Sequence, residues 1–458
     1  MLPAFGGGQV FGLQVIPLPG GELVTALIIC LAAFNLIRMI LYLAGAHVYM
    51  IKRASSKDRA YLWRRGAGHR IAYQPTVSLV VPVHNESVVI ERTLDCLIKL
   101  DYAALQIIVA DDGSTDDTLE RIYAYKRAHD PRDILHVFAQ PNGGKADVLN
   151  NAIRAMATGE LIMCLDGDSV LAPDAITKSV DYFRDPRVVA TASNVNILPD
   201  RRLLGLVQRY EYLISYHIKK AHNAFNIEYI IGGIGSMFRR NVLDEVGLYD
   251  TNTMTEDIDL TLKILAKKGN RTQRLAYAHD AITFTEAVPS FRSLVRQRYR
   301  WKYGRLQTFY KNYRLFFSRD KKHSFGLSWF FLPLALWQEV LFFFEPLIVT
   351  VIIAVTIHYR SPWTLLPAMI IVSGFVIANI LGTVHLSWRG KALLSLMAPL
   401  VYVFMYIVSV VEYIALLQAI VGLPRLRKSI SGEQVTWRSP ERTGELKDGR
   451  RRAERVAA

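Results

Sequence analysis

The sequence predicts an α/β protein with a mostly parallel sheet, inserted between apolar N-terminal and C-terminal segments. Short apolar runs alternate with helix-like segments from Pro75 onward, and this order predicts parallel strands joined by right-handed crossovers. Long apolar runs lie outside that region, over residues 26–50 and beyond Phe325. They exceed the roughly 20 residues that a helix needs to cross a bilayer. We therefore expect a soluble domain flanked by transmembrane helices.

The N-terminal region predicts one transmembrane helix. Residues 1–22 carry no charge apart from Glu22 and have no basic start, which argues against a cleaved signal peptide. Residues 23–49 are apolar apart from an interruption at Arg38. The basic residues that follow favour the cytoplasm for the next segment. We expect an N-terminal segment with its helix over 1–50 and a basic cytoplasmic linker over 51–74.

The α/β region is predicted to extend over residues 75–318. Apolar runs bounded by turn residues predict strands over 77–83, 106–110, 134–139, 161–165 and 188–194. Amphipathic spacing predicts helices over 88–100, 118–128, 145–158, 203–225 and 289–317. The last of these carries several arginines among aromatic residues, which is typical of a helix that lies partly at a membrane surface.

Three apolar blocks follow, over residues 327–357, 364–386 and 392–421. Pro333 and Pro346 interrupt the first block, so the number of spans stays open. We expect a membrane region over 325–422 and a basic tail over 423–458, which the charge rule places in the cytoplasm.

The net charge of +15 is better explained by a membrane than by nucleic acid. Many basic residues flank the apolar runs and mark no nucleic-acid-binding module. The three cysteines lack a C-x-x-C spacing, which argues against a disulfide framework or a zinc site.

One stretch predicts a metal site. Residues 161–165 form an apolar run that ends directly in Asp166-Gly167-Asp168. Ligands of open α/β sheets bind beyond the carboxyl ends of the strands, where these two carboxylates would lie. Such oxygen ligands suit Mg²⁺ or Mn²⁺. A solvated turn is the alternative for this short motif taken alone.

Other polar groups end neighbouring strands at the same predicted edge. Asn85 and Glu86 follow the first strand, and Asp111 and Asp112 follow the second. Carboxylates there can accept hydrogen bonds from a uracil N–H or from ribose hydroxyls. Lys145 follows Asn142-Gly143-Gly144 at a predicted helix start, where an ammonium and backbone N–H groups suit a diphosphate. The spacing is not that of a Walker ATPase loop.

Six motifs in order give the chain a resemblance to the processive family 2 glycosyltransferases, the membrane synthases of cellulose, chitin, hyaluronan and poly-N-acetylglucosamine. They are V-P-x-x-N-E, D-D-G-S-x-D, N-x-G-K-A, D-x-D, T-E-D and Q-x-x-R-W. The resemblance covers about residues 75–306 and implies a GT-A type catalytic domain.

The resemblance also implies roles for individual residues. Asp111 and Asp112 resemble the uridine-contacting pair, and Asp166 and Asp168 resemble the ligands of a divalent cation on the donor diphosphate. The residues expected to bind the donor are Pro82, Asn85, Glu86, Asp111, Asp112, Lys145, Asp166, Asp168 and Arg300.

On the acceptor side, Asp257 resembles the general base, with Glu256 beside it in the same motif. Glycine-rich residues 232–240 correspond to a loop near the acceptor's end. The expected acceptor-binding residues are Gly235, Ser236, Gln297, Arg300 and Trp301. Glu339, Glu345 and Glu412 lie inside apolar blocks and are candidates for a polymer channel, with interfacial placement as the alternative.

The implied activity is inverting polymerisation of a UDP-sugar and secretion of the product through the enzyme's own helices. UDP-N-acetylglucosamine is favoured, because residues 300–307 resemble those of bacterial poly-N-acetylglucosamine synthases. Hyaluronan-, chitin- or cellulose-type synthesis and a non-processive transfer to a lipid phosphate carrier are alternatives. The expected location is the bacterial inner membrane, with a cytoplasmic catalytic domain. Expected partners are the donor, a growing polysaccharide, the bilayer and accessory membrane or envelope proteins, without nucleic acid.

Overall fold

The structure is a computed structural model that describes residues 9–10, 13–14, 21–66, 73–130, 132–200, 202–359, 366–383 and 386–426. The predicted tail over 423–458 therefore lies mostly outside the described residues. Two short strands, β1 (Gln9–Val10) and β2 (Leu13–Gln14), pair near the N-terminus.

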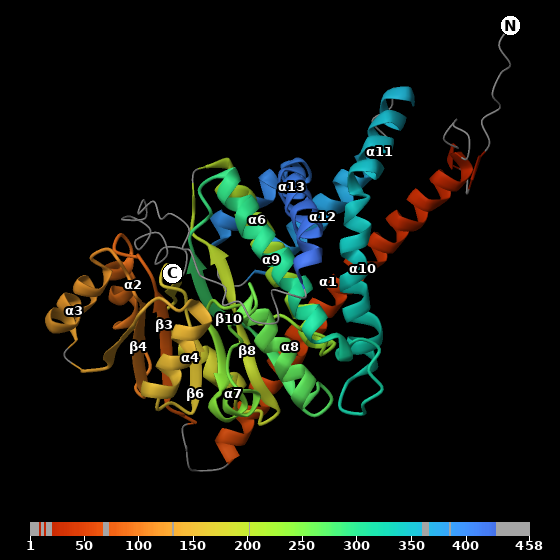
Figure 1. Cartoon of the computed structure of the whole chain (residues 1–458). Helices are drawn as coiled ribbons and strands as arrows, with labels where there is room; N and C mark the ends of the chain where they lie inside the picture. The colour runs from red at the N-terminus through yellow and green to blue at the C-terminus, as the bar shows by residue number, and fades with distance from the viewer. Residues whose placement is uncertain are drawn as a thin grey trace, which may run out of the picture.

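An eight-stranded sheet organises the α/β region, in the order β5-β4-β3-β6-β9-β8-β10-β7 (Figure 1). Its strands are β3 (Val77–Val83), β4 (Leu105–Asp112), β5 (Leu135–Gln140), β6 (Leu161–Cys164), β7 (Val170–Leu171), β8 (Val188–Ile197), β9 (Ser236–Arg239) and β10 (Arg274–Thr285). β5, β4, β3 and β6 are mutually parallel, as are β8 and β10. The mostly parallel sheet expected from the sequence is confirmed.

Helices cover both faces of this sheet. They are α2 (Ile90–Leu97), α3 (Thr118–His129), α4 (Lys145–Met156), α5 (Ala175–Tyr182), α6 (Leu203–Ala224), α7 (Arg240–Val246), α8 (Glu256–Lys268) and α9 (Phe291–Lys311), followed by a short 3₁₀ turn, η1 (Tyr313–Leu315). Alternate side chains of β3 point to opposite faces. Leu79 packs in a core with α2, α3 and α5, whereas Val80 packs in a second core with α4, α7 and α8.

The antiparallel strand β9 departs from the sequence prediction. Residues 232–240 were expected to form a glycine-rich loop, but Ser236–Arg239 pair with β6 on one side and β8 on the other. The segment is only four residues long, and its flanking glycines hide the strand signal. The consequence is functional, because Ser236 pairs with Cys164 and holds the residues before it beside the carboxyl end of β6.

The apolar helices form a separate group. They are α1 (Gly21–Gly66), η2 (Gly326–Phe331), α10 (Leu332–Phe343), α11 (Glu345–Tyr359), α12 (Leu366–Leu381) and α13 (Trp388–Gly422), which ends in a 3₁₀ turn, η4 (Leu423–Arg425). Pro333 and Pro346 lie in the first turns of α10 and α11, where proline is tolerated. They divide the predicted first block into two helices.

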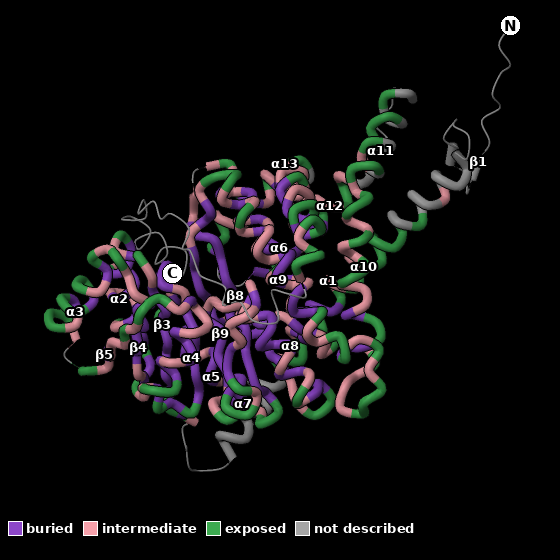
Figure 2. Tube along the Cα trace, in the orientation of Figure 1, coloured by how far each residue is buried: buried purple, intermediate pink, exposed green. Residues whose placement is uncertain are grey.

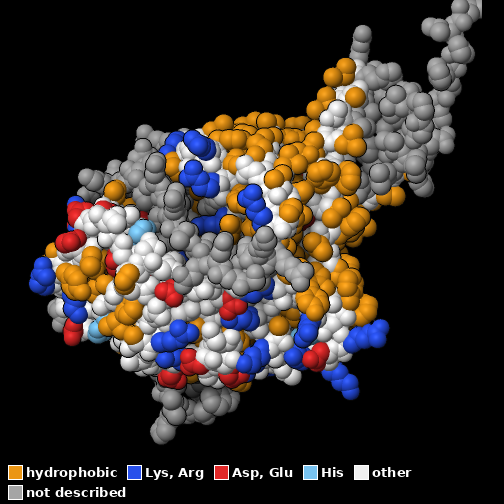
Figure 3. Space-filling view, viewed as in Figure 1, with side chains coloured by type: hydrophobic (Ala, Val, Ile, Leu, Met, Phe, Trp, Pro, Cys, Tyr) orange, Lys and Arg blue, Asp and Glu red, His pale blue; other side chains and the backbone are white. Residues whose placement is uncertain are grey.

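Three described helical segments are long and apolar enough to cross a membrane: Ala33–Ser55, Gly326–Phe343 and Val403–Arg425. Many residues of these helices are exposed (Figure 2), and their exposed residues include many large apolar ones. Hydrophobic groups gather over these helices in the upper right of Figure 3. Charged side chains lie mainly over the α/β region in the lower part of that view. Such a large apolar surface is typical of contact with lipid.

Helix α1 connects the two parts of the molecule. It continues to Gly66, through much of the segment that the sequence analysis assigns to a linker. Gly45 lies so close to α6 that an added Cβ would be 2.7 Å from the Cβ of Ala221. Near the end of its apolar part, Tyr49 Oη donates to the backbone oxygen of Tyr277 at 2.5 Å, and Arg53 pairs with Asp181 at 2.9 Å. These contacts fix α1 to β10 and α5.

Candidate active site

A partly buried ion-pair group lies beyond the carboxyl end of β6. Lys145 Nζ, from the start of α4, lies 2.7 Å from Asp166 Oδ1 and 2.9 Å from Glu256 Oε1. All three side chains are at most 29% exposed. Although burial alone would lower the pKa of Lys145, the two carboxylates raise it above its ordinary value. Lys145 is therefore charged and joins the predicted donor side to the predicted catalytic motif.

Asp257 lies next to this group at the start of α8. Its Oδ2 accepts a hydrogen bond from the Gly233 N–H at 2.9 Å, and its Oδ1 accepts one from the Ile258 N–H at 2.8 Å. Burial, followed by the charge of Glu256, raises the pKa of Asp257 to about 6, although Lys145 and the two N–H groups lower it. A carboxylate with this pKa is ionised at neutral pH and is a stronger base than an exposed aspartate.

The glycine-rich segment before β9 permits this close arrangement. A Cβ on Gly233 would lie 3.2 Å from Lys145 Nζ. Gly235 has a φ of +65°, and a Cβ there would lie 2.6 Å from Ser193 Oγ and 2.7 Å from Thr283 Oγ1. A side chain at Gly235 would thus be both strained and crowded. Ser236 is buried in β9, so its immediate role is to hold this segment in place.

The Asp166-Gly167-Asp168 turn packs on residues that follow β3. A Cβ on Gly167 would lie 3.3 Å from the backbone oxygen of Pro82 and 3.6 Å from Glu86 Cγ. Thr93 Oγ1, from α2, donates to the Gly167 carbonyl oxygen at 2.7 Å. The structure thus brings Pro82, Glu86 and the two aspartates together, as the sequence analysis expects of the donor side.

Asp166 and Asp168 offer the oxygen ligands that a hard divalent cation prefers. Asp168 is 4% exposed, and its Oδ1 accepts a hydrogen bond from Ser169 Oγ at 3.1 Å. Within the described part of the chain, no group of three or more His, Cys, Asp or Glu side chains gathers as a preformed metal site. The two carboxylates suit a cation whose remaining ligands come from a diphosphate and water, as is usual for Mg²⁺.

The aspartate pair that ends β4 organises two loops. Asp112 is fully buried, and its two carboxylate oxygens accept hydrogen bonds from the N–H groups of Gly143 and Gly144 at 2.9 and 2.8 Å. It thereby fixes the turn that presents Lys145. Asp111 Oδ2 accepts from the Ser114 N–H at 3.0 Å, so it shapes the loop after β4.

Asn85 links the loops that follow β3 and β4. It has a φ of 54°, which asparagine tolerates better than most residues, and its Oδ1 accepts from the Thr115 N–H at 2.8 Å. The sequence analysis expects a donor contact from Asn85, Asp111 and Asp112. The structure adds a local role for each, namely to hold the backbone of this edge of the sheet.

The predicted acceptor residues Gln297, Arg300 and Trp301 all lie on α9. Gly304 of the same helix packs so closely on Thr255 that an added Cβ would lie 2.6 Å from its Cγ2 and Oγ1. Gln297, Trp301 and Gly304 are spaced as neighbours along one helix face. This places their face of α9 toward the start of the Thr255-Glu256-Asp257 motif.

Sequence reasoning missed Gln307 as a residue that supports the site. It is fully buried, and its Oε1 accepts a hydrogen bond from the Met254 N–H at 2.9 Å, just before the Thr-Glu-Asp motif. In the sequence, Gln307 stands out only as part of residues 300–307, which resemble those of poly-N-acetylglucosamine synthases. Together, Gly304 and Gln307 fix α9 against the start of α8.

Sequence reasoning also missed a charge cluster between the α/β region and the apolar helices. We define the charge cluster as Arg298, Lys302 and Arg305 of α9 with Glu211 of α6, Glu339 of α10 and Glu412 of α13. Lys302 Nζ lies 2.9 Å from both Glu339 Oε2 and Glu412 Oε2. Two of the three carboxylates predicted for a channel are thus ion-paired, and the third, Glu345, accepts from Ser409 Oγ at 3.0 Å. The sequence signal that could have indicated this cluster is the helical spacing of Arg298, Lys302 and Arg305 on α9.

Tyr212 follows Glu211 on α6. Burial raises its pKa to about 12. The charges that also act on this hydroxyl include Arg298 and Glu211 from the cluster and Asp168 and Asp166 from the end of β6. The Tyr212 hydroxyl is therefore within electrostatic range of both groups of charges.

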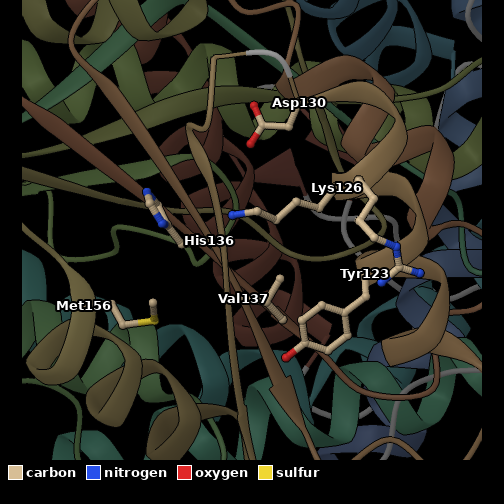
Figure 4. Close-up of a pocket in the computed structure, with 7 residues that line it drawn as sticks. Tyr123, Lys126, Asp130, His136, Val137 and Met156 are labelled. Atoms are coloured by element: carbon tan, nitrogen blue, oxygen red, sulfur yellow. The ribbon is translucent and has the colours of Figure 1, made fainter.

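A hollow of about 550 Å³ lies elsewhere, between α3 and the edge strand β5 (Figure 4). Its lining residues are Tyr123, Lys126, Arg127, Asp130, His136, Val137 and Met156. None of them belongs to the motifs above. The candidate active site is therefore not this hollow but the edge of the sheet around Lys145 and Asp257.

Comparison with known families agrees with this arrangement of motifs. The protein-family model described as "Glycosyltransferase like family 2" matches residues 74–304, about half of the chain. The matched region covers β3 through most of α9. The chain belongs to this family. It is a glycosyltransferase, and its α/β region has the GT-A-like fold, with a mostly parallel sheet between apolar helices.

Two relatives carry the name of a polysaccharide synthase, and the match to the first extends beyond the catalytic domain. The chain is 28% identical over 385 residues to the poly-beta-1,6-N-acetyl-D-glucosamine synthase of Staphylococcus epidermidis, covering 80% of this chain and 87% of the relative. It is 32% identical over 254 residues to the synthase of the same name from Staphylococcus aureus, covering 55% and 59%.

A solved structure supports the fold. The mannosyltransferase PcManGT of Pyrobaculum calidifontis, in complex with GDP-Man and Mn²⁺, aligns with a TM-score of 0.50 at 24% identity. The alignment covers 82% of this chain and 98% of that protein, and thus includes more than the catalytic domain.

Proposed function

We propose that this glycosyltransferase polymerises N-acetylglucosamine from UDP-N-acetylglucosamine into a β-linked polysaccharide. The observation that carries the proposal is the grouping of Lys145, Asp166, Glu256 and Asp257, which joins a donor site to a base. The names of the staphylococcal relatives favour this sugar, and their likeness extends over most of this chain.

The donor half of the site is built to hold a nucleotide diphosphate. Asp166 and Asp168 would hold Mg²⁺ or Mn²⁺, which when bound neutralises charge on the leaving diphosphate. The Lys145 ammonium adds a second positive charge at the same place, and Arg300 of α9 is proposed to approach the diphosphate from the acceptor side. On the nucleotide's side of the site, the proposed contacts are Asn85, Glu86, Asp111 and Asp112.

The acceptor half supplies the proton acceptor. Asp257 removes the proton from an acceptor hydroxyl, whose oxygen attacks the anomeric carbon while the bond to the diphosphate breaks. The N–H groups of Gly233 and Ile258 hold the carboxylate in one orientation, so little reorganisation is needed during the reaction. Gln297 and Trp301 hold the acceptor, with the indole ring as an apolar surface for a sugar.

The apolar helices are proposed to insert this enzyme in the bacterial inner membrane as a multi-pass protein, with the catalytic domain in the cytoplasm. Three described segments have the required length and composition. The basic residues after Tyr49 support the cytoplasmic side for the domain. The product is proposed to leave through these helices, with accessory envelope proteins as partners.

A donor panel tests the proposed activity. Purified enzyme in detergent is incubated with Mg²⁺ or Mn²⁺ and each of several UDP-sugars and GDP-mannose, and both nucleotide release and product size are measured. We expect UDP release and long products with UDP-N-acetylglucosamine. Polymer from another donor would overturn the sugar assignment, and transfer of single sugars to a lipid phosphate would overturn processive synthesis.

The substitution Asp257→Asn tests the base. Loss of a positioned general base should lower the transfer rate by about 10²–10⁴-fold while donor binding persists. The matched control is Asp244→Asn, because Asp244 is a half-exposed carboxylate on α7 that pairs with Arg240 at 3.4 Å. Full polymer synthesis by Asp257→Asn would remove this residue from the mechanism.

A further inference from the structure

Arg298 makes an unusual set of contacts inside the charge cluster. Its two terminal nitrogens lie 2.7 and 2.8 Å from the two carboxylate oxygens of Glu211, and one of them also lies 3.4 Å from Glu412. Its side chain is 4% exposed. The central carbon of its guanidinium lies 4.2 Å from the ring centroid of Trp301. One planar group thus contacts two carboxylates and an indole.

We propose that Arg298 is a positioning residue that holds the Trp301 ring ready for the acceptor. This inference rests on the proposed function, in which Trp301 contacts the acceptor sugar. A flat ring has two faces, and the guanidinium covers one of them. Arg298 therefore fixes the ring's orientation and leaves the opposite face as the surface on which a sugar can stack.

The carboxylate partners explain why the guanidinium is held so firmly. A fork-shaped pair with Glu211 fixes the plane of the guanidinium as well as its position. Glu211 belongs to α6 and Glu412 to α13, so two helices other than α9 hold the guanidinium. Lysine can replace the charge of Arg298 but neither the fork nor the stacking plane.

The rest of the charge cluster also holds α9 against the apolar helices. Lys302 and Arg305, one and two turns after Arg298, pair with Glu339 and Glu412 of the apolar helices. Three positive and three negative side chains are thus matched across four helices. Because buried ion pairs rarely add stability over apolar packing, their value here lies in the orientation they impose.

The first test compares Arg298→Lys with wild type and with Arg296→Lys, an exposed arginine on the same helix. Donor affinity is measured by titration with the UDP-sugar and metal, and acceptor use by the KM for an N-acetylglucosamine oligosaccharide and by product length. We expect unchanged donor affinity, an acceptor KM raised by about tenfold and shorter products with Arg298→Lys, from the loss of the stacked cation. The control should match wild type. Unchanged acceptor KM and product length in Arg298→Lys would overturn the proposal.

A second measurement follows the ring itself. Acrylamide quenching of tryptophan fluorescence is compared in each background with and without Trp301→Phe, so that the difference reports Trp301. Quenching of Trp301 should increase in Arg298→Lys and in Glu211→Gln, which keeps the arginine and removes its fork partner. Equal quenching in all backgrounds would overturn the positioning role. This result does not depend on catalysis, so it stays decisive if wild type makes no polymer and the proposed function itself fails.

Discussion

Replacing Glu256 by Gln should move the acidic limb of the enzyme's pH profile to lower pH. The base must be ionised to accept a proton, so activity falls as the pH drops through the pKa of Asp257. That pKa is about 6, compared with an ordinary value of 3.8. The difference of about 2 units corresponds to about 3 kcal/mol against the ionised form.

Burial is the main cause of this rise, and the negative charge of Glu256 is the second. The Glu256→Gln substitution removes the negative charge of Glu256 but leaves Asp257 buried, so only part of the rise in the pKa of Asp257 should disappear. Because the Glu256 side chain is 15% exposed, solvent screens its charge incompletely. We expect the limb to shift down by about half a unit to one unit, which is about a three- to fivefold gain in the ionised fraction near pH 5.

The assay is the initial rate of nucleotide release at saturating donor and metal and limiting acceptor, from about pH 4.5 to about pH 9, since kcat/KM reports the free enzyme's groups. Each sample is returned to neutral pH to confirm that it has stayed folded. The quantity compared is the pH at which the acidic limb falls to half of the plateau rate, so a change in the plateau rate itself does not affect the comparison. A limb that stays in place or moves upward, or one that Asp244→Asn shifts equally, would refute the electrostatic argument.

Three further outcomes are expected. Asp168→Ala should abolish the metal-dependent part of UDP-sugar binding, measured by titration with and without Mn²⁺, and unchanged binding would remove the residue as a ligand. Asp112→Ala leaves the part-buried N–H of Gly143 and the buried N–H of Gly144 without their carboxylate partner, and it should lower the free energy of unfolding by about 2–4 kcal/mol, measured by thermal unfolding in detergent; an unchanged Tm would contradict this. Gly304→Ala places a Cβ 2.6 Å from Thr255, so it should lower the free energy of unfolding by about 1–3 kcal/mol and slow sugar transfer. The control Gly374→Ala adds a Cβ with no atom within 4 Å and should change neither quantity.

The sequence allowed the parallel half of the sheet to be predicted closely, because its strands are continuous apolar runs. β3 coincides with the predicted 77–83, and β6 ends one residue before the predicted 165. The second half was harder. β9 is four residues long, and β10, which runs for twelve, was not predicted. Their place in the sheet depends on pairing with distant strands, which no local pattern encodes.

The candidate site shows the same division. Motif order predicted Lys145, Asp166 and Asp257 as site residues, but it did not reveal that Lys145 bridges Asp166 and Glu256. It likewise gave no reason to pair Arg298 with Glu211, which lies 87 residues away in the chain. A side chain's charge can be read from the sequence, whereas its partner depends on how α6, α9 and α13 pack together.

The long helix α1 has a consequence for how the product grows. Its 46 residues extend for about 70 Å, more than twice the thickness of a bilayer's hydrocarbon core. Tyr49 and Arg53 fix it to β10 and α5 near the end of its apolar stretch. If the chain is inserted as proposed, helix α1 keeps the sheet at a constant distance from the lipid. The enzyme then cannot rise to follow a lengthening polymer, and after each addition the polymer itself must advance by one sugar.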